Sequence, residues 1–181
     1  LADPPIDDVK RLAFDLLRLP RIRAGVLMCV ALFLPIGFYD ATLDRYLTDL
    51  GGSDRLIGFS FLAYGVPFAL LATLGGRLAA RHGALRMAAW GTVLVVPLTI
   101  SYGFIHVPAA IVALSAVEGC IQALAVPASQ AMVAHGAPVG RAAAAQGLAG
   151  AATLLVATVT AYLAGGIYGA LGPEWMFVIA G

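Results

Sequence analysis

The chain has 181 residues, of which 61% are hydrophobic and only 12% are charged, and its mean hydropathy is +0.91. A soluble domain has roughly 45–50% apolar and about 25% charged residues, so this composition excludes an ordinary soluble domain and indicates a membrane protein. The net charge is +1, and the charged residues lie between apolar runs without forming a basic patch, so we expect no nucleic-acid partner.

Residues 1–23 form a polar lead before the first apolar run. Between residues 7 and 19, apolar positions recur at helical spacing with basic residues between them, as in an amphipathic helix at a membrane surface. An ordinary linker turn explains the same stretch, and the sequence leaves both alternatives open. The chain begins with Leu1 and ends inside an apolar run, which suggests a piece of a longer protein.

Five apolar stretches are each long enough to cross a roughly 30 Å hydrocarbon layer as a helix. A sixth begins at residue 174 and is cut off by the end of the chain. The sequence therefore predicts an all-α transmembrane helical bundle over residues 24–181, with five full spans and the start of a sixth. The full spans are placed at residues 24–47, 56–74, 87–104, 109–133 and 142–167.

Glycine, proline and aromatic residues give local expectations within these spans. Gly58 and Gly65, seven residues apart, predict a face of the second span that another helix approaches closely. Prolines inside three spans predict kinks or local unwinding: Pro35, Pro67 and Pro97. Aromatic residues near predicted span ends are interpreted as an interfacial belt: Tyr46, Trp90, Tyr102 and Trp175.

Basic residues lie almost entirely at one end of the predicted bundle. Only Arg45 and Arg55 fall at the other end. By the positive-inside rule, the N-terminal end of this chain is cytoplasmic and residues 1–23 are a cytoplasmic linker. We therefore expect a multi-pass protein of the plasma (inner) membrane, in contact with the lipid bilayer. The nine residues on the predicted cytoplasmic side are Lys10, Arg11, Arg18, Arg21, Arg23, Arg77, Arg81, Arg86 and Arg141.

Glu118 lies near the middle of the otherwise apolar fourth span. A carboxylate at the bilayer centre costs about 2.5–3.5 kcal/mol on insertion scales, so it should face the bundle interior or a watery cavity. Ser115, Gln122 and Ser129 fall close to the same helix face, and a desolvated carboxyl group in that stripe could exchange a proton near neutral pH. A structural hydrogen bond between helices is the alternative, and the sequence leaves it open.

Three more polar residues are candidates for a substrate or proton cavity. Asp40 lies in the outer third of the first span, as either a cavity residue or a carboxylate that reaches the interface. Tyr64 is a candidate on the second span. Gln146 starts a polar stripe with Thr153 and Thr160 on the fifth span, where packing between helices is the more frequent explanation.

Enzyme motifs are absent from the sequence, since no GxSxG, HExxH or Walker A pattern occurs. Cys29 and Cys120 lie in apolar runs without metal-ligand spacing, and the three histidines lie in predicted loops without a paired carboxylate. We therefore expect a protein that is not an enzyme and that needs neither a cofactor nor a metal.

The basic stretch between the second and third spans resembles the loop motif G-x-L-a-D-R-x-G-R-R of the major facilitator superfamily. The acidic position of that motif is Ala80 here, so the acid of a charge-based gating lock is missing. In that family the motif follows the second helix of each six-helix half, and eroded copies are common in the second half. The residues of this loop motif are Gly76, Arg77, Leu78, Ala79, Arg81, Gly83 and Arg86.

The resemblance implies that the chain is the C-terminal half of such a transporter, truncated within its last helix, with the N-terminal six-helix half as its partner. It implies alternating access to a small-molecule site at the midplane, with Glu118 and Asp40 as cavity residues coupled to protons. The cavity walls are apolar, and polar and aromatic clusters like those of sugar-binding sites are scarce. Both features favour the efflux of small hydrophobic molecules, as by an antiporter. Uptake of a metabolite or sugar, and a non-transporting membrane partner or assembly module, remain alternatives.

Overall fold

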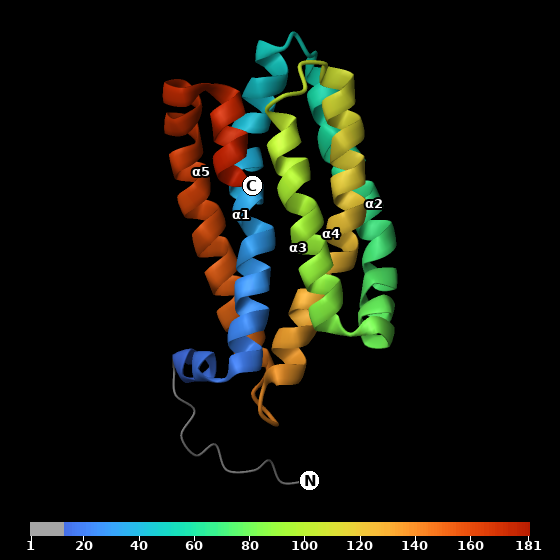
Figure 1. Ribbon diagram of the computed structural model, residues 1–181, viewed down its shortest axis with the longest axis vertical. Helices are drawn as coiled ribbons and strands as arrows, with labels where there is room; N and C mark the ends of the chain where they lie inside the picture. Colours follow the sequence, from blue (N-terminus) through green and yellow to red (C-terminus); the bar gives the residue numbers. More distant parts are fainter. Residues whose placement is uncertain (1–12) are drawn as a thin grey trace.

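The computed structural model describes residues 13–181, which form a bundle of long helices (Figure 1). Gly172 interrupts the last helix with φ = 84°, and the residues after it fold back beside α1 (Figure 1). The predicted all-α bundle, with five spans and the start of a sixth, is therefore confirmed. A 3₁₀-helix, η1 (Ala13–Arg18), precedes α1 (Pro20–Asp49), α2 (Asp54–His82), α3 (Ala84–Tyr102), α4 (Pro108–Gly136) and α5 (Ala142–Ala180).

The α-helices of this part of the chain are all long and apolar enough to cross a membrane. The α2–α3 and α4–α5 connections lie at the same end of the bundle as η1 (Figure 1). The α1–α2 and α3–α4 connections and the break at Gly172 lie at the opposite end (Figure 1). This antiparallel arrangement gathers the described basic residues predicted to be cytoplasmic at one end, with Arg45 and Arg55 at the other.

The described residues before α1 form a short, partly buried 3₁₀-helix. The predicted amphipathic stretch at residues 7–19 lies partly outside the described residues, and its described part is η1. Leu16 is buried in η1, whereas Phe14 is exposed. Since α1 begins at Pro20, where a proline suits the first helical turn, the first transmembrane helix starts before the predicted boundary at residue 24.

An ion pair holds η1 against the connection between α4 and α5. The Arg141 Nη2 donates to Asp15 Oδ1 at 3.1 Å, and Nη1 donates to Oδ2 of the same carboxylate. The hydrogen bond to Asp15 raises the pKa of the Arg141 guanidinium above its ordinary value. The pair therefore stays ionised at neutral pH. The guanidinium binds the carboxylate through two nitrogens at once, a bidentate geometry that lysine cannot reproduce.

We expect Arg141→Lys to increase amide hydrogen exchange in η1 about two- to five-fold, the range expected for weakening a partly exposed ion pair. The thermal midpoint of the whole protein should not change, because the pair fixes only η1. Arg55→Gln at the other end of the bundle is the control. Unchanged exchange of residues 13–18 in the Arg141 variant would show that the pair does not hold η1.

The basic stretch predicted to be a loop is helical up to His82, so that prediction is wrong. Leucine, alanine and arginine favour helix, and nothing before Gly83 stops α2. The turn consists of Gly83 alone, with φ = 93°, and its N–H donates to the Ala79 carbonyl oxygen at 3.0 Å. Gly83 ends α2 and precedes α3, so the expectation that it supplies the turn is confirmed.

Gly83→Ala should lower the stability of the folded protein by about 1–3 kcal/mol, because a side chain strains a backbone at this φ. The measurement is the thermal midpoint of the purified protein in detergent. Gly76→Ala is the matched control, since a Cβ at that position of α2 meets no atom within 4 Å. Equal midpoints for the two variants would contradict the assigned role of Gly83.

Glycines set the closest contacts between helices. A Cβ on Gly75 or Gly119 would collide with the backbone of the facing helix in the α2–α4 pair. A Cβ on Gly37 of α1 would collide with α5. Within residues 13–181, however, nothing lies within 4 Å of a Cβ built on Gly58 or Gly65, so no helix of this part of the chain makes the predicted close approach. Those two glycines lie off the face of α2 that packs on α4.

The internal prolines do not unwind their helices. Helical structure continues through Pro35, Pro67 and Pro97, so the predicted local unwinding does not occur. The break in helical geometry falls instead at Gly172, directly before Pro173 of α5. Proline disfavours helical geometry in the residue before it, and glycine tolerates the resulting positive φ.

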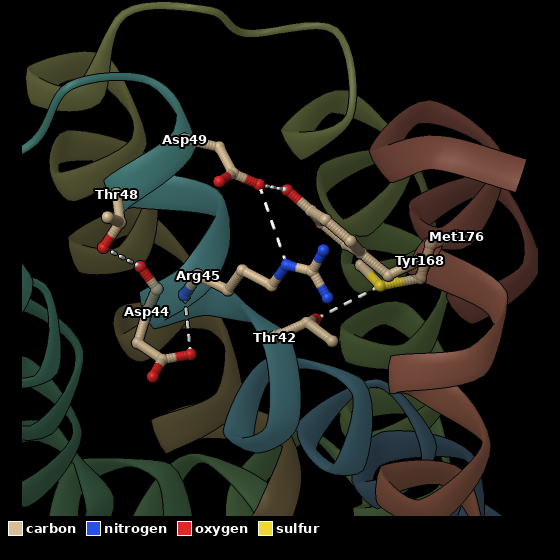
Figure 2. Close-up of polar contacts among 7 residues, drawn as sticks. All are labelled: Thr42, Asp44, Arg45, Thr48, Asp49, Tyr168 and Met176. Atoms are coloured by element: carbon tan, nitrogen blue, oxygen red, sulfur yellow. Dashed lines mark hydrogen bonds and ion pairs between the residues drawn. The ribbon is translucent and has the colours of Figure 1, made fainter. Parts of the chain in front are cut away.

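A polar cluster joins α1 to α5 at the end opposite η1 (Figure 2). The Tyr168 hydroxyl donates to Asp49 Oδ2 at 2.6 Å. The Arg45 guanidinium lies 4.8 Å from the centroid of the Tyr168 ring, and its Nε lies 3.9 Å from Asp49 Oδ2. Below these groups, the Thr42 hydroxyl lies 3.1 Å from Met176 Sδ, which ties the segment after Gly172 to α1 (Figure 2).

The two tryptophans of the predicted aromatic belt are exposed, whereas the two tyrosines are buried, so the belt prediction is wrong for the tyrosines. Trp90 and Trp175 are 63% and 61% exposed, whereas Tyr46 and Tyr102 are each 1% exposed. The Tyr46 hydroxyl lies 3.0 Å from the Tyr102 carbonyl oxygen and 2.9 Å from that of Ile105. Helix packing therefore buries these two rings in the core, beside the segment that follows Gly172.

Candidate functional site

A small cavity lies between α1 and α4, with α2 and α3 completing its walls. Its volume is about 60 Å³. A buried water needs roughly 10–15 Å³ by this measure, whereas ligand pockets span roughly 300–1,000 Å³, so the cavity has room for a few waters but not for a drug-sized substrate. Its polar lining consists of Tyr39, Asp40, Ser60, Tyr64, Tyr102, Ser115 and Glu118.

Glu118 is 2% exposed and is held by two neutral hydrogen-bond donors. Its Oε2 accepts from the Tyr102 hydroxyl at 2.9 Å, across from α3. Its Oε1 accepts from Gln122 Nε2 at 3.0 Å, one turn further along α4. The prediction that Glu118 faces the bundle interior is confirmed.

The hydrogen bonds continue beyond these two donors. The Tyr64 hydroxyl of α2 donates to Gln122 Oε1 at 3.1 Å. The Ser115 hydroxyl donates to the Ile111 carbonyl oxygen at 3.0 Å and lies 3.1 Å from the Tyr102 hydroxyl oxygen. A connected polar network thus runs from α2 through α4 to α3, with Glu118 at its centre.

This network can satisfy both protonation states of Glu118. Tyr102 has one hydroxyl hydrogen and two acceptors within reach, the Glu118 carboxylate and the Ser115 hydroxyl oxygen. With Glu118 ionised, Tyr102 donates to the carboxylate. With Glu118 protonated at Oε2, the carboxyl group donates to the Tyr102 oxygen and Tyr102 donates to Ser115. The hydrogen bonds can therefore adapt to a proton that Glu118 exchanges with the cavity by rotation of hydroxyl groups alone.

No basic side chain of residues 13–181 lines this cavity. The arginines and histidines in that range lie at or near helix ends. The charge of an ionised Glu118 is therefore not balanced by a cation from this part of the chain. A buried charge without a partner is costly, so a proton or a substrate cation would stabilise this arrangement.

The other candidate residues are distributed between this cavity and distant positions. Asp40 lines the same cavity and is exposed at its edge. Gln146 lies apart, donating from Nε2 to the Gln130 carbonyl oxygen at 2.8 Å, beside a separate cavity of about 100 Å³. The hydroxyl groups of Thr153 and Thr160 bond carbonyl oxygens of their own helix.

The loop-motif residues also lie far from Glu118. Gly76, Arg77, Leu78 and Arg81 occupy the last turns of α2, and Arg86 lies in the first turn of α3. At about 1.5 Å per residue, roughly 18 Å of helix separates Tyr64 from Gly76, the first residue of this motif. The motif therefore belongs to the basic end of the bundle and not to the cavity.

Sequence reasoning missed Tyr39 and Tyr102 as cavity residues. The Tyr39 hydroxyl donates to Thr99 Oγ1 at 2.9 Å, and its ring centroid lies 5.1 Å from that of Tyr102. One signal could have identified Tyr102. The short connection after α3 makes α3 and α4 antiparallel neighbours, which brings the end of α3 near the start of α4, where Ser115 and Glu118 follow.

The fold and the site agree with a comparison to known protein families. A family model of the Major Facilitator Superfamily matches residues 22–181, which include α2 to α5 and nearly all of α1. No curated protein matches the chain at a significant level. The members of this family are membrane transporters, and the chain is a multi-pass membrane protein. This chain therefore belongs to the major facilitator superfamily.

Proposed function

We propose that the chain is the C-terminal half of a secondary transporter that exports small hydrophobic molecules in exchange for protons, by alternating access. Glu118 is the residue that carries the proton. The observation that supports this proposal is a buried carboxyl group beside a small cavity, held only by neutral donors and without a cation from residues 13–181.

The hydrogen-bond network supports a role in proton exchange over a purely structural role. A structural carboxylate needs donors for one charge state only, whereas the Tyr102 and Ser115 hydroxyls accommodate both states of Glu118. Asp40, exposed at the edge of the same cavity, offers a second carboxylate between Glu118 and the surroundings.

The size of the cavity supports a second wall supplied by an N-terminal half. About 60 Å³ is too small for a substrate, so the site is completed by other helices or by a rearrangement. The outer face of α2 bears large apolar side chains that no described residue covers, and part of this face fits against such a half. They are Phe59, Phe61, Leu62, Val66 and Leu70.

We also propose that the protein lies in the plasma (inner) membrane with the η1 end cytoplasmic. The support is the uneven distribution of basic residues between the two ends of the bundle. Labelling a cysteine introduced at the exposed Val139, in the α4–α5 connection, with a membrane-impermeant thiol reagent tests this orientation. Labelling in inside-out vesicles but not in intact cells is the expected result.

The experiment that tests the function is a substrate panel on the intact protein in inside-out vesicles, with and without a pH gradient. We expect hydrophobic substrates to accumulate in the lumen only when the lumen is acidic, and the accumulation to collapse when a protonophore is added. Movement of a substrate in the same direction as protons would support uptake instead. Failure of every substrate to move would favour a non-transporting partner.

A further inference from the structure

A larger cavity, of about 380 Å³, lies at the basic end of the bundle. It sits where α1 and α3 begin and α4 ends. Its walls include the apolar side chains of Ala24, Leu85 and Met132, and its polar groups are Arg21 and His135. The volume falls within the roughly 300–1,000 Å³ of small-molecule pockets. It is far from Glu118, so the proposed transport mechanism does not use it.

The charge of this cavity favours an anion. No acidic side chain of residues 13–181 lines it, and neither Arg21 nor His135 pairs with a carboxylate in that range. The helix starts that meet there add to this effect, because neither α1 nor α3 has a side-chain cap or an acidic residue in its first turn. Their positive ends are not neutralised by side chains of their own first turns, and they are two against the single negative end of α4, which also meets the cavity.

The cavity also adjoins an apolar surface that faces outward. Leu85, in its wall, is 57% exposed, and over the next two turns of α3 Trp90 and Val93 are 63% and 59% exposed. A ligand in the cavity thus has two basic side chains at its head and an apolar helix face beside it. A free phosphate ion would use only the first of these features.

We propose that this cavity binds the headgroup of an anionic phospholipid, with the acyl chains lying along the outer face of α3. Arg21 pairs with the lipid phosphate, and His135 donates a hydrogen bond to a headgroup oxygen. Basic pockets between transmembrane helices at a membrane interface are suited to such headgroups. The proposal holds for either orientation of the protein, because it depends only on the position of the cavity at one interface.

Lipid binding to the intact protein, purified in a neutral detergent, tests this proposal by native mass spectrometry. Phosphatidylglycerol and phosphatidylcholine with the same acyl chains are titrated in parallel, and inorganic phosphate is added as a competitor. We expect phosphatidylglycerol to bind preferentially. Arg21→Gln should weaken that binding about five-fold, which equals about 1 kcal/mol for one basic residue near an anionic headgroup.

A second variant tests the cavity without changing its charge. Ala24→Leu fills part of the cavity and should also weaken phosphatidylglycerol binding, whereas Arg55→Gln at the opposite end should not. Thermal midpoints confirm that all the variants are folded. Equal binding of the two lipids, full retention in Arg21→Gln, or displacement of phosphatidylglycerol by millimolar phosphate would each overturn the proposal.

Discussion

Glu118→Gln is expected to abolish proton-driven transport and to leave the amount of protein in the membrane nearly unchanged. The substitution keeps the shape of the side chain and its hydrogen bonds. The amide oxygen accepts from Tyr102, and the amide nitrogen donates to a reoriented Gln122 side chain. The ability to bind and release a proton is the property that is lost.

The measurement is substrate accumulation in inside-out vesicles under an imposed pH gradient, compared with substrate exchange at equal pH on both sides. We expect exchange to survive in Glu118→Gln and accumulation to fall to the level of empty vesicles. Asp44→Asn is the matched control. It makes the same change from carboxylate to amide at an exposed position of α1 that does not line the cavity.

This experiment separates the two interpretations of Glu118 that the sequence leaves open. If Glu118 serves only as a hydrogen-bond acceptor between helices, the glutamine variant keeps that role and should transport normally. Normal pH-dependent accumulation by Glu118→Gln would therefore refute its role in coupling. Glu118→Ala does not separate the interpretations, because it also leaves Tyr102 and Gln122 without their shared partner.

The spans could be predicted from sequence because apolar length is a direct physical requirement for crossing a membrane. The ends of the helices could not be predicted equally well. Hydropathy falls at Arg77 and Arg81, and a loop was predicted there, but α2 continues to His82 because helix formation depends on backbone propensity as well as on hydropathy. Gly83 was recognisable as the turn, since glycine is the residue that tolerates its positive φ.

The sequence identified part of the candidate site. Asp40 and Tyr64 were recognisable as polar residues of apolar spans, and both line the cavity, but only residues that share one helix could be placed beside one another. Ser115, Glu118 and Gln122 lie on one face of α4, and helical periodicity identifies that face directly. Tyr102 was assigned to the interface because it lies near a span end, but in the folded chain it contacts Glu118 from the neighbouring helix. Periodicity within one helix contains no information on which residue of another helix lies opposite.

The contact between α2 and α4 depends on the absence of a side chain at Gly119. A Cβ built there would collide with the carbonyl oxygen of Tyr64. Because that oxygen belongs to the backbone of α2, the collision cannot be relieved by rotation of a side chain. The two helices would have to separate, and the hydrogen bond from the Tyr64 hydroxyl to Gln122 would lengthen or break.

Gly119→Ala is therefore expected to destabilise the protein by about 1–3 kcal/mol, the usual cost of overpacking a close contact, and to reduce transport as well. Gly65→Ala is the control on α2, and it should not lower the stability, because no described atom lies within 4 Å of a Cβ there. Thermal midpoints in detergent and initial rates in vesicles measure the two effects. If Gly119→Ala has the same midpoint as the wild-type protein, α2 and α4 do not pack as closely as this contact requires. A lowered midpoint with normal transport would instead separate the packing of α2 on α4 from the function of the polar network around Glu118.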